Sequence, residues 1–147
     1  MKCNTFGYSK AVVSQSGIYA IPNRASGRIY IGYTQTGFGR RWGMHISNLR
    51  CGTHPNAPLQ RDWIEFREES FSFHILEVIH CDVPKEYFLL REWMYIKAMS
   101  NPYNDILKME TGILRRYIRQ GVLETVPPIK ITPNDLLGYT PTETDHA

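Results

Sequence analysis

The sequence lacks the features that would place it in a membrane, a fibre or the secretory pathway. None of its 147 residues belongs to an apolar run of the length that a membrane-spanning helix needs. The first residues, MKCNTFGYSKAVVSQSG, contain no continuous apolar stretch typical of a signal peptide. With 42% hydrophobic and 12% aromatic residues, however, the chain can form a core, which excludes full disorder. We therefore expect one cytoplasmic domain with a short appendage.

Cysteine is scarce and widely spaced. The three residues, Cys3, Cys51 and Cys81, are odd in number and form no CxxC pair. The spacing excludes a disulfide framework and a zinc site of the usual type, so we expect reduced thiols.

Acidic residues are absent from the first 61 positions, which hold eight lysines and arginines; the first carboxylate is Asp62. The whole chain has a net charge of only +3, so the remaining residues are net acidic. A strongly basic part within one domain indicates an anionic partner, most simply nucleic acid. The alternative is that the acids gather by chance on later, exposed helices.

Hydrophobic periodicity predicts an α+β fold. A turn-forming segment, Asn23-Arg24-Ala25-Ser26-Gly27, separates two β-branched and aromatic runs, as in a β-hairpin. The remaining pattern predicts helices over 38–50, 57–69, 84–99 and 106–119 and a strand over 71–79. We expect a small three-stranded, mostly antiparallel sheet flanked by helices. The tail from Val126, which holds four of the nine prolines, is predicted to be extended or disordered.

The hairpin is predicted to place two tyrosines on one face. If Pro22 pairs with Gly27 across a four-residue loop, Tyr19 stands opposite Tyr30. Ile18, Ala20, Ile29 and Ile31 then line the core face, and the two tyrosines share the solvent face with Ile21 and Arg28. A plain packing pair of tyrosines would give the same pattern.

Two later features carry chemistry. Arg41 and His45 are four residues apart and share a helix face, where arginine suits phosphate oxygens and histidine can move a proton; solvated surface residues would look alike. Glu92 falls inside the apolar arc of its helix, between Ile96 and Phe88. A buried carboxylate needs a metal or an ion-pair partner, and both remain open.

These features form an ordered set of motifs. They are GIY at 17–19, YIG at 30–32 after ten intervening residues, Thr34, RWxxH at 41–45, HxNxxLQ at 54–60, FSFHILEVI at 71–79, Arg91-Glu92 and Tyr103-Asn104. The set spans about 90 residues, from Gly17 to Ile106, and resembles the signature of the GIY-YIG nuclease superfamily. In detail it is most similar to the nuclease domain of phage-encoded intron homing endonucleases.

The resemblance implies a metal-dependent endodeoxyribonuclease with the GIY-YIG fold and an active site of Tyr19, Tyr30, Arg41, His45, His54, Glu92 and Asn104. Arg41 would stabilise transition-state charge, and Glu92 would hold one Mg²⁺ or Mn²⁺ ion. Tyr19 would be the general base, its pKa lowered by nearby cations. The other tyrosine and the histidines would orient the water and the scissile phosphate, and Asn104 would support the site. Alternatively, His54 is a loop-surface residue and Asn104 a cap or turn residue.

The partner implied is DNA, with no membrane and no small-molecule cofactor, in the cytoplasm of a bacterial or phage-infected cell. We expect the basic residues Arg28, Arg40, Arg50 and Arg61 to contact it. The chain is divided into an N-terminal extension (1–15), a nuclease domain (16–106), an appended helix (107–121) and a tail (122–147). A repair or restriction nuclease of the same superfamily and a non-catalytic DNA-binding module remain alternatives, and the oligomeric state stays open.

Overall fold

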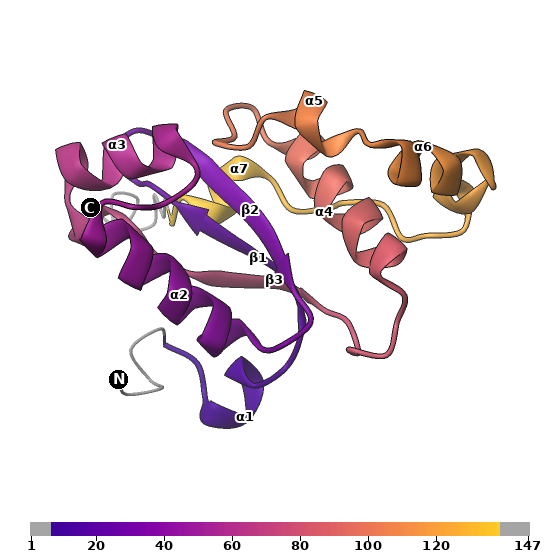
Figure 1. The fold of residues 1–147 in the computed structure, drawn as a ribbon, viewed down its shortest axis with the longest axis horizontal. Coiled ribbons are helices and arrows are strands. Elements are labelled where there is room, and N and C mark those ends of the chain that lie inside the picture. Colours follow the sequence, from indigo (N-terminus) through magenta and orange to yellow (C-terminus); the bar gives the residue numbers. More distant parts are fainter. Residues whose placement is uncertain (1–6, 139–147) are drawn as a thin grey trace, which may run out of the picture.

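A three-stranded antiparallel sheet forms the centre of the computed structural model, which describes residues 7–138 (Figure 1). The strands are β1 (Gly17–Pro22), β2 (Ile29–Thr34) and β3 (His74–Val78), in the order β2-β1-β3. The predicted α+β class and the third strand beside the hairpin are confirmed. β3 is shorter than the predicted 71–79, and Phe71 meets the sheet only through an isolated bridge to Asn23.

The predicted hairpin register is wrong by two residues. Pro22 pairs with Ile29, so Tyr19 stands opposite Gly32, and Tyr30 stands opposite Ile21. The cause lies in Asn23, whose side-chain oxygen accepts hydrogen bonds from the backbone N–H groups of the turn, at 2.9 Å from Ala25. The turn thus begins one residue later than expected. A shift of two preserves which face each side chain occupies.

Helices cover both faces of the sheet (Figure 1). On one face, α1 (Lys10–Val13), α2 (Phe38–Cys51) and α3 (Ala57–Phe66) pack against Tyr19 and Ile21. On the other, α4 (Lys85–Ala98) packs against Ile18, Ile29 and Ile31, as predicted for the core face. The central strand β1 is therefore buried on both faces, whereas the edge strand β2 keeps two half-buried tyrosines, Tyr30 and Tyr33.

The helices begin and end at residues with clear local causes. Gly52, with φ 76°, ends α2 in the left-handed conformation. The Asn56 side chain accepts a hydrogen bond from the Leu59 N–H and begins α3. This helix stops at Phe66, short of the predicted Glu69, because Arg67 has φ 72° and a 3₁₀ turn, η2 (Glu68–Ser70), follows.

The C-terminal part differs from the prediction. The single helix expected over 106–119 is two helices, α5 (Ile106–Met109) and α6 (Gly112–Arg119), because Thr111 caps the second. A 3₁₀ turn, η3 (Val122–Glu124), and a short helix, α7 (Pro133–Leu136), follow.

The described part of the tail is packed rather than loose. Leu136 is buried against the α4 side of the core, together with half-buried apolar residues of the same segment. Arg91 of α4 forms an ion pair with Glu77 at 2.7 Å and donates to the Pro127 carbonyl, which ties the tail to the domain. The rest of the predicted tail, 139–147, lies outside the described residues.

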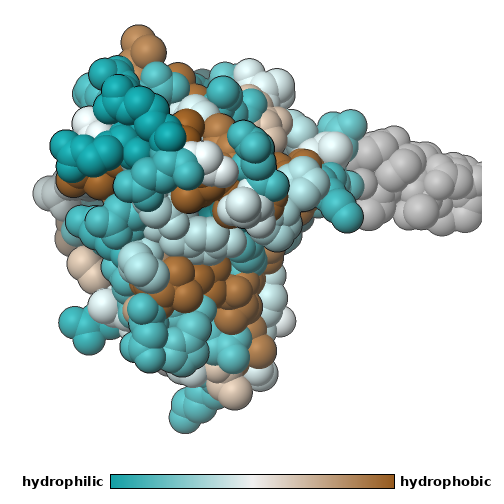
Figure 2. Space-filling model, turned by 90° about the vertical axis from the view of Figure 1, so that its right-hand side faces the viewer, coloured by the Kyte–Doolittle hydropathy of each residue, from teal (hydrophilic) through white to brown (hydrophobic). Residues whose placement is uncertain are grey.

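The surface on the α6 side is mostly hydrophilic, with apolar patches among the polar side chains (Figure 2). In the part of the chain that the structure describes, no helix combines the length and apolarity needed to cross a membrane.

Candidate active site

Tyr19 and Tyr30 lie on the same face of the sheet, as predicted, but this face does not meet solvent. Tyr19 is fully buried because α2 covers it, with Phe38 and Trp42 packed edge-on against its ring at 6.4 and 6.1 Å between centroids. Tyr30 is half-buried. The expectation of a solvent-exposed tyrosine face is therefore wrong, because an amphipathic helix followed the hairpin and packed onto it.

The two glycines of the strand motifs make room for this packing. A Cβ on Gly32 would lie 2.4 Å from the Tyr19 hydroxyl, so the strand partner of Tyr19 must lack a side chain. At Gly17, φ is 149° and a Cβ would collide with the Glu77 carbonyl at 1.9 Å, beside the bulge between β1 and β3. Gly32 therefore makes room for the Tyr19 ring, and Gly17 allows the close approach of the β3 backbone to β1.

A chain of hydrogen bonds connects Tyr19 to the loop before α3. The Tyr19 hydroxyl lies 2.6 Å from Nε2 of His45, and Nδ1 of His45 lies 2.7 Å from Nε2 of His54. Nδ1 of His54 accepts from the backbone N–H of Asn56 at 3.0 Å. The structure thus brings together a tyrosine and two histidines that lie far apart in the sequence.

The hydrogen bond from the Asn56 N–H to His54, at the end of this series, fixes the position of each proton in it. His54 accepts at Nδ1, so its neutral ring carries the proton on Nε2 and donates it to Nδ1 of His45. His45 then carries its own proton on Nε2 and donates to the Tyr19 oxygen. Burial lowers the pKa of His45 to about 3, with further contributions from Arg41 and His54, and also lowers the pKa of His54. Both rings are therefore neutral, and neither can accept the Tyr19 proton through these contacts.

Arg41 is the electrostatic centre of the site. Burial raises the pKa of Tyr19 above its usual value, and the charge of Arg41 opposes this rise. Burial raises the pKa of Tyr30 to about 12, assisted by Glu92 and again opposed by Arg41. The expected lowering of the Tyr19 pKa is therefore wrong for the protein alone, because desolvation exceeds the effect of the cation.

Glu92 is buried on α4, as its place in the apolar arc predicted, with 6% of its surface exposed. Burial raises its pKa to about 8, although the charge of Arg41 lowers it in part. No residue in the described range forms an ion pair with Glu92; its neighbour Arg91 pairs with Glu77 instead. The structural ion pair considered for Glu92 is therefore not formed within 7–138.

The surroundings of Glu92 fit a divalent cation. A buried carboxylate without an ion-pair partner is costly, and a bound cation would stabilise its charged form. Mg²⁺ takes one or two protein carboxylates and completes its shell with water and phosphate oxygens, so Glu92 alone can hold it.

Asn104 supports the edge of the sheet. Its side-chain amide donates to the Ile31 carbonyl at 2.8 Å and accepts from the Ile31 N–H at 2.9 Å. The Tyr103 N–H donates to the Ile29 carbonyl at 2.8 Å. The loop after α4 thus acts as a short extra strand on β2, beside Tyr30, and satisfies the free edge. This role is closer to support than to contact with a reacting group.

The four arginines expected to contact DNA differ in their surroundings. Arg40 and Arg61 are exposed. Arg50 is exposed but forms an ion pair with Glu68 at 2.6 Å. Arg28 lies over the Tyr103 ring at 4.5 Å and donates to the Pro102 carbonyl, so it also holds the loop that carries Asn104.

Sequence reasoning missed several supporting residues. Tyr33 borders the site: burial raises its pKa, and both Glu92 and Arg41 act on it. Gln60 accepts from the backbone N–H of His54 and donates to the Leu49 carbonyl, which joins the His54 loop to α2. Its presence in the HxNxxLQ motif was the available signal. No pattern in the sequence singled out Tyr33.

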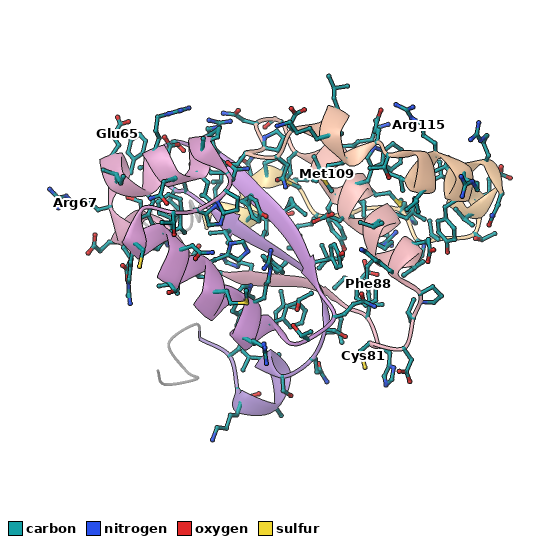
Figure 3. The ribbon with its side chains drawn as sticks, in the orientation of Figure 1. Glu65, Arg67, Cys81, Phe88, Met109 and Arg115 are labelled. Carbon is teal, nitrogen blue, oxygen red and sulfur yellow. The ribbon has the colours of Figure 1, made fainter. Side chains whose placement is uncertain are left out.

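Figure 3 draws the side chains on the whole ribbon and labels several residues outside the site. Glu65 and Arg67 project from the end of α3 into solvent, and Arg115 projects from α6 at the edge where α5 also lies.

Comparisons with known proteins find matches in both sequence and fold. A profile of the GIY-YIG catalytic domain matches residues 15–104. The "Intron-associated endonuclease 1" of Enterobacteria phage T4 is 32% identical over 90 residues, which are 61% of this chain and 35% of that protein. The solved catalytic domain of homing endonuclease I-TevI is 32% identical with a TM-score of 0.55, over 61% of this chain and 97% of the other. A mutant of the same domain matches equally, over 92% of its length. The match thus spans about a third of the curated relative, and the sheet with its helices is the fold of the solved domain.

Proposed function

Because this chain belongs to the family of GIY-YIG catalytic domains, we propose that it is an endonuclease that hydrolyses DNA phosphodiester bonds with one divalent cation, Mg²⁺ or Mn²⁺. The observation that carries the proposal is that Glu92 and Arg41 both act on Tyr19, which is buried, and on Tyr30, which is half-buried. Glu92 has no ion-pair partner among the described residues, so it is free to hold a cation. The charge of Arg41 lowers the pKa of Glu92 and of both tyrosines in part, so it would also stabilise the negative charge that builds on a phosphate during cleavage.

Each residue then has a defined role. Arg41 donates to a non-bridging phosphate oxygen and stabilises the charge of the transition state. Tyr19 orients the attacking water and takes its proton as a phenolate, which forms only after the phenol has released its own proton to solvent; His45 donates through Nε2 to the phenolate oxygen. The raised pKa of Tyr19 means that this transfer depends on the positive charge of Arg41. His54 fixes the tautomer of His45, and Tyr30 borders the phosphate.

Glu92 holds the cation, which would polarise the phosphate and a bound water when present. Tyr33 and Asn104 complete the surroundings by shaping and supporting the β2 edge. One site of this kind cuts one strand at a time. The proposed setting is the cytoplasm of a bacterial or phage-infected cell, in keeping with the phage relative.

The proposal is tested by nicking of a supercoiled plasmid. We expect the wild-type protein to nick with Mg²⁺ and to stop in EDTA. Arg41→Ala should lose about 10²–10³ in rate, the usual cost of one transition-state donor. The matched control is Arg67→Asn, which removes an exposed charge at the far end of α3 and suits the positive φ there.

Three results would count against the proposal. Nicking that survives EDTA would contradict the metal-dependent mechanism. A wild-type protein that binds DNA and never cuts it would favour the binding module. Equal losses in Arg41→Ala and Arg67→Asn would mean that Arg41 acts only as a surface charge.

A further inference from the structure

A groove opens from the active site toward α5, and of its lining residues Asp105, Lys108 and Met109 lie beyond the range that the family profile matches. Its volume is about 480 Å³, and its walls are the loop before α3 and the segment from Tyr103 to Met109. Tyr30 and His54, both placed in the active site, lie along it, and Lys108 and Met109 of α5 line it. The groove is therefore continuous with the catalytic residues, although the profile ends at 104.

Lys108 is the one lysine or arginine among the described residues that line this groove. The side chain is exposed and forms no ion pair with any residue in the range 7–138. One carboxylate, Asp105, also lines the groove, but it caps α5 by accepting from the Leu107 N–H at 3.1 Å. The ammonium of Lys108 is therefore available to an anion in the groove.

The basic character continues beyond the groove. Three exposed arginines of α6, Arg115, Arg116 and Arg119, follow Lys108 along the chain. Arg115 projects at the same edge of the molecule as α5 (Figure 3), and the most hydrophilic side chains gather on the upper part of the α6 face (Figure 2). Positive charge is therefore also present on α6, the helix that follows α5 in the chain.

We propose that this groove holds the DNA strand next to the scissile phosphate, and that Lys108 contacts a flanking phosphate. The inference rests on the proposed nuclease function, because the strand must continue from the reacting phosphate and the groove continues from Tyr30 and His54. The walls contain prolines and Met109, which suit sugar and base surfaces. Lysine is a flexible point charge, which suits contact with the backbone without reading sequence.

The test measures binding of a duplex by fluorescence anisotropy in EDTA, with Glu92→Gln as the parent so that the substrate stays intact. Lys108→Gln should raise Kd about threefold to tenfold and reduce the slope of log K against log salt by about 0.9, the value of one phosphate contact. Lys85→Gln is the matched control: this lysine is exposed at the start of α4 and does not line the groove. We expect it to bind like the parent.

A second measurement locates the contact. After the cut site of the wild-type protein is mapped with Mg²⁺, single phosphates beside it are replaced by uncharged methylphosphonates. One flanking position should weaken binding of the parent and have no further effect on Lys108→Gln. The same position weakening both proteins would place the contact elsewhere and overturn the inference.

Failure of this inference is separable from failure of the nuclease proposal. If the wild-type protein cuts DNA while Lys108→Gln and Lys85→Gln both bind like the parent, the groove does not hold the strand and only the inference falls. If Lys108→Gln changes self-association in ultracentrifugation and leaves Kd unchanged, a second copy fills the groove, and the inference is again wrong. A wild-type protein that neither binds nor cuts DNA removes the nuclease proposal itself.

Discussion

Tyr19, His45 and Glu92 are titratable side chains with 0%, 3% and 6% of their surface exposed, respectively. Burial raises the pKa of the tyrosine and of the carboxyl group and lowers that of the histidine, so it favours the uncharged form of all three. Among these neighbours Arg41 keeps its charge at neutral pH. The resting site is therefore positive, which attracts a phosphate before any cation arrives.

The proton positions in the hydrogen-bonded chain can be observed directly. We expect ¹⁵N NMR of the imidazoles to show His45 and His54 neutral at pH 7, each protonated on Nε2. His45 should remain neutral down to pH 5, because burial lowers its pKa to about 3. A His45 ring that carries its proton on Nδ1, or that becomes charged near pH 6, would contradict the assigned chain.

Glu92 should make the metal-free protein less stable as the pH rises. Its pKa is about 8 in the folded protein and about 4.3 in an unfolded chain, so folding favours the protonated form. The stability that protonated Glu92 contributes is therefore lost as the pH rises from about 4.3 to about 8. His45 acts in the opposite direction below about pH 6.5, where the unfolded histidine gains a proton. The window from about pH 6.5 to 8 therefore isolates the carboxyl group.

The measurement is urea unfolding in EDTA across this window. We expect the free energy of unfolding of the wild-type protein to fall relative to that of Glu92→Gln, which cannot ionise. Parallel curves for the two proteins would mean that Glu92 ionises as it does in water.

At the scale of elements, the loop after α4 supports the edge of β2. Asn104→Ala removes two hydrogen bonds to Ile31 and leaves its partly buried backbone groups unpaired, which should cost about 1–3 kcal/mol of stability. The control is Asn101→Ala, since the Asn101 side chain is exposed. Urea unfolding measures the stability of both variants. If Asn104→Ala is as stable as Asn101→Ala, Asn104 does not support the edge of β2.

The type of an element, helix or strand, was predictable where the local hydrophobic periodicity fits only one of the two. The hairpin, the helix that begins at Phe38 and the third strand follow from periodicity, and the two-residue register error left the faces intact because the side-chain period of a strand is two. The burial of Tyr19 was not predictable from the hairpin, because it depends on how α2 folds over the sheet. Helix ends were missed where a single backbone angle or cap decides them, as at Arg67 and Thr111.

In the candidate site, too, the sequence identified residues but not the contacts between them. The spacing of motifs identified Arg41, His45 and Glu92 as candidates, and the structure places them around one pair of tyrosines. The direction of the Tyr19 pKa shift, the contact of Gln60 with His54 and the proximity of Tyr33 depend on packing between distant segments. A linear pattern carries no information about these distances.

At the scale of the whole molecule, only some of the described basic residues in the first 61 positions form ion pairs with acidic residues that follow them in the sequence. Arg50 pairs with Glu68, whereas Arg40 and Arg61 are exposed. We expect DNA affinity to fall steeply with salt, with a slope of about −0.9 for each phosphate contact. Arg40→Gln or Arg61→Gln should reduce this slope more than Arg50→Gln, because Glu68 already neutralises Arg50. Affinity that stays flat from low to physiological salt would exclude the basic region as the binding surface.

In the proposed site Glu92 holds the catalytic cation while Arg41 stabilises charge, and one calorimetric titration separates these two roles. Mn²⁺ is titrated into the wild-type protein, Glu92→Gln and Arg41→Ala, and plasmid cleavage is measured on the same samples. We expect Glu92→Gln to lose both metal binding and cleavage while it keeps its fold, and Arg41→Ala to bind metal but cleave about 10²–10³ times more slowly. Glu92→Gln that binds Mn²⁺ and cuts at the wild-type rate would contradict the account.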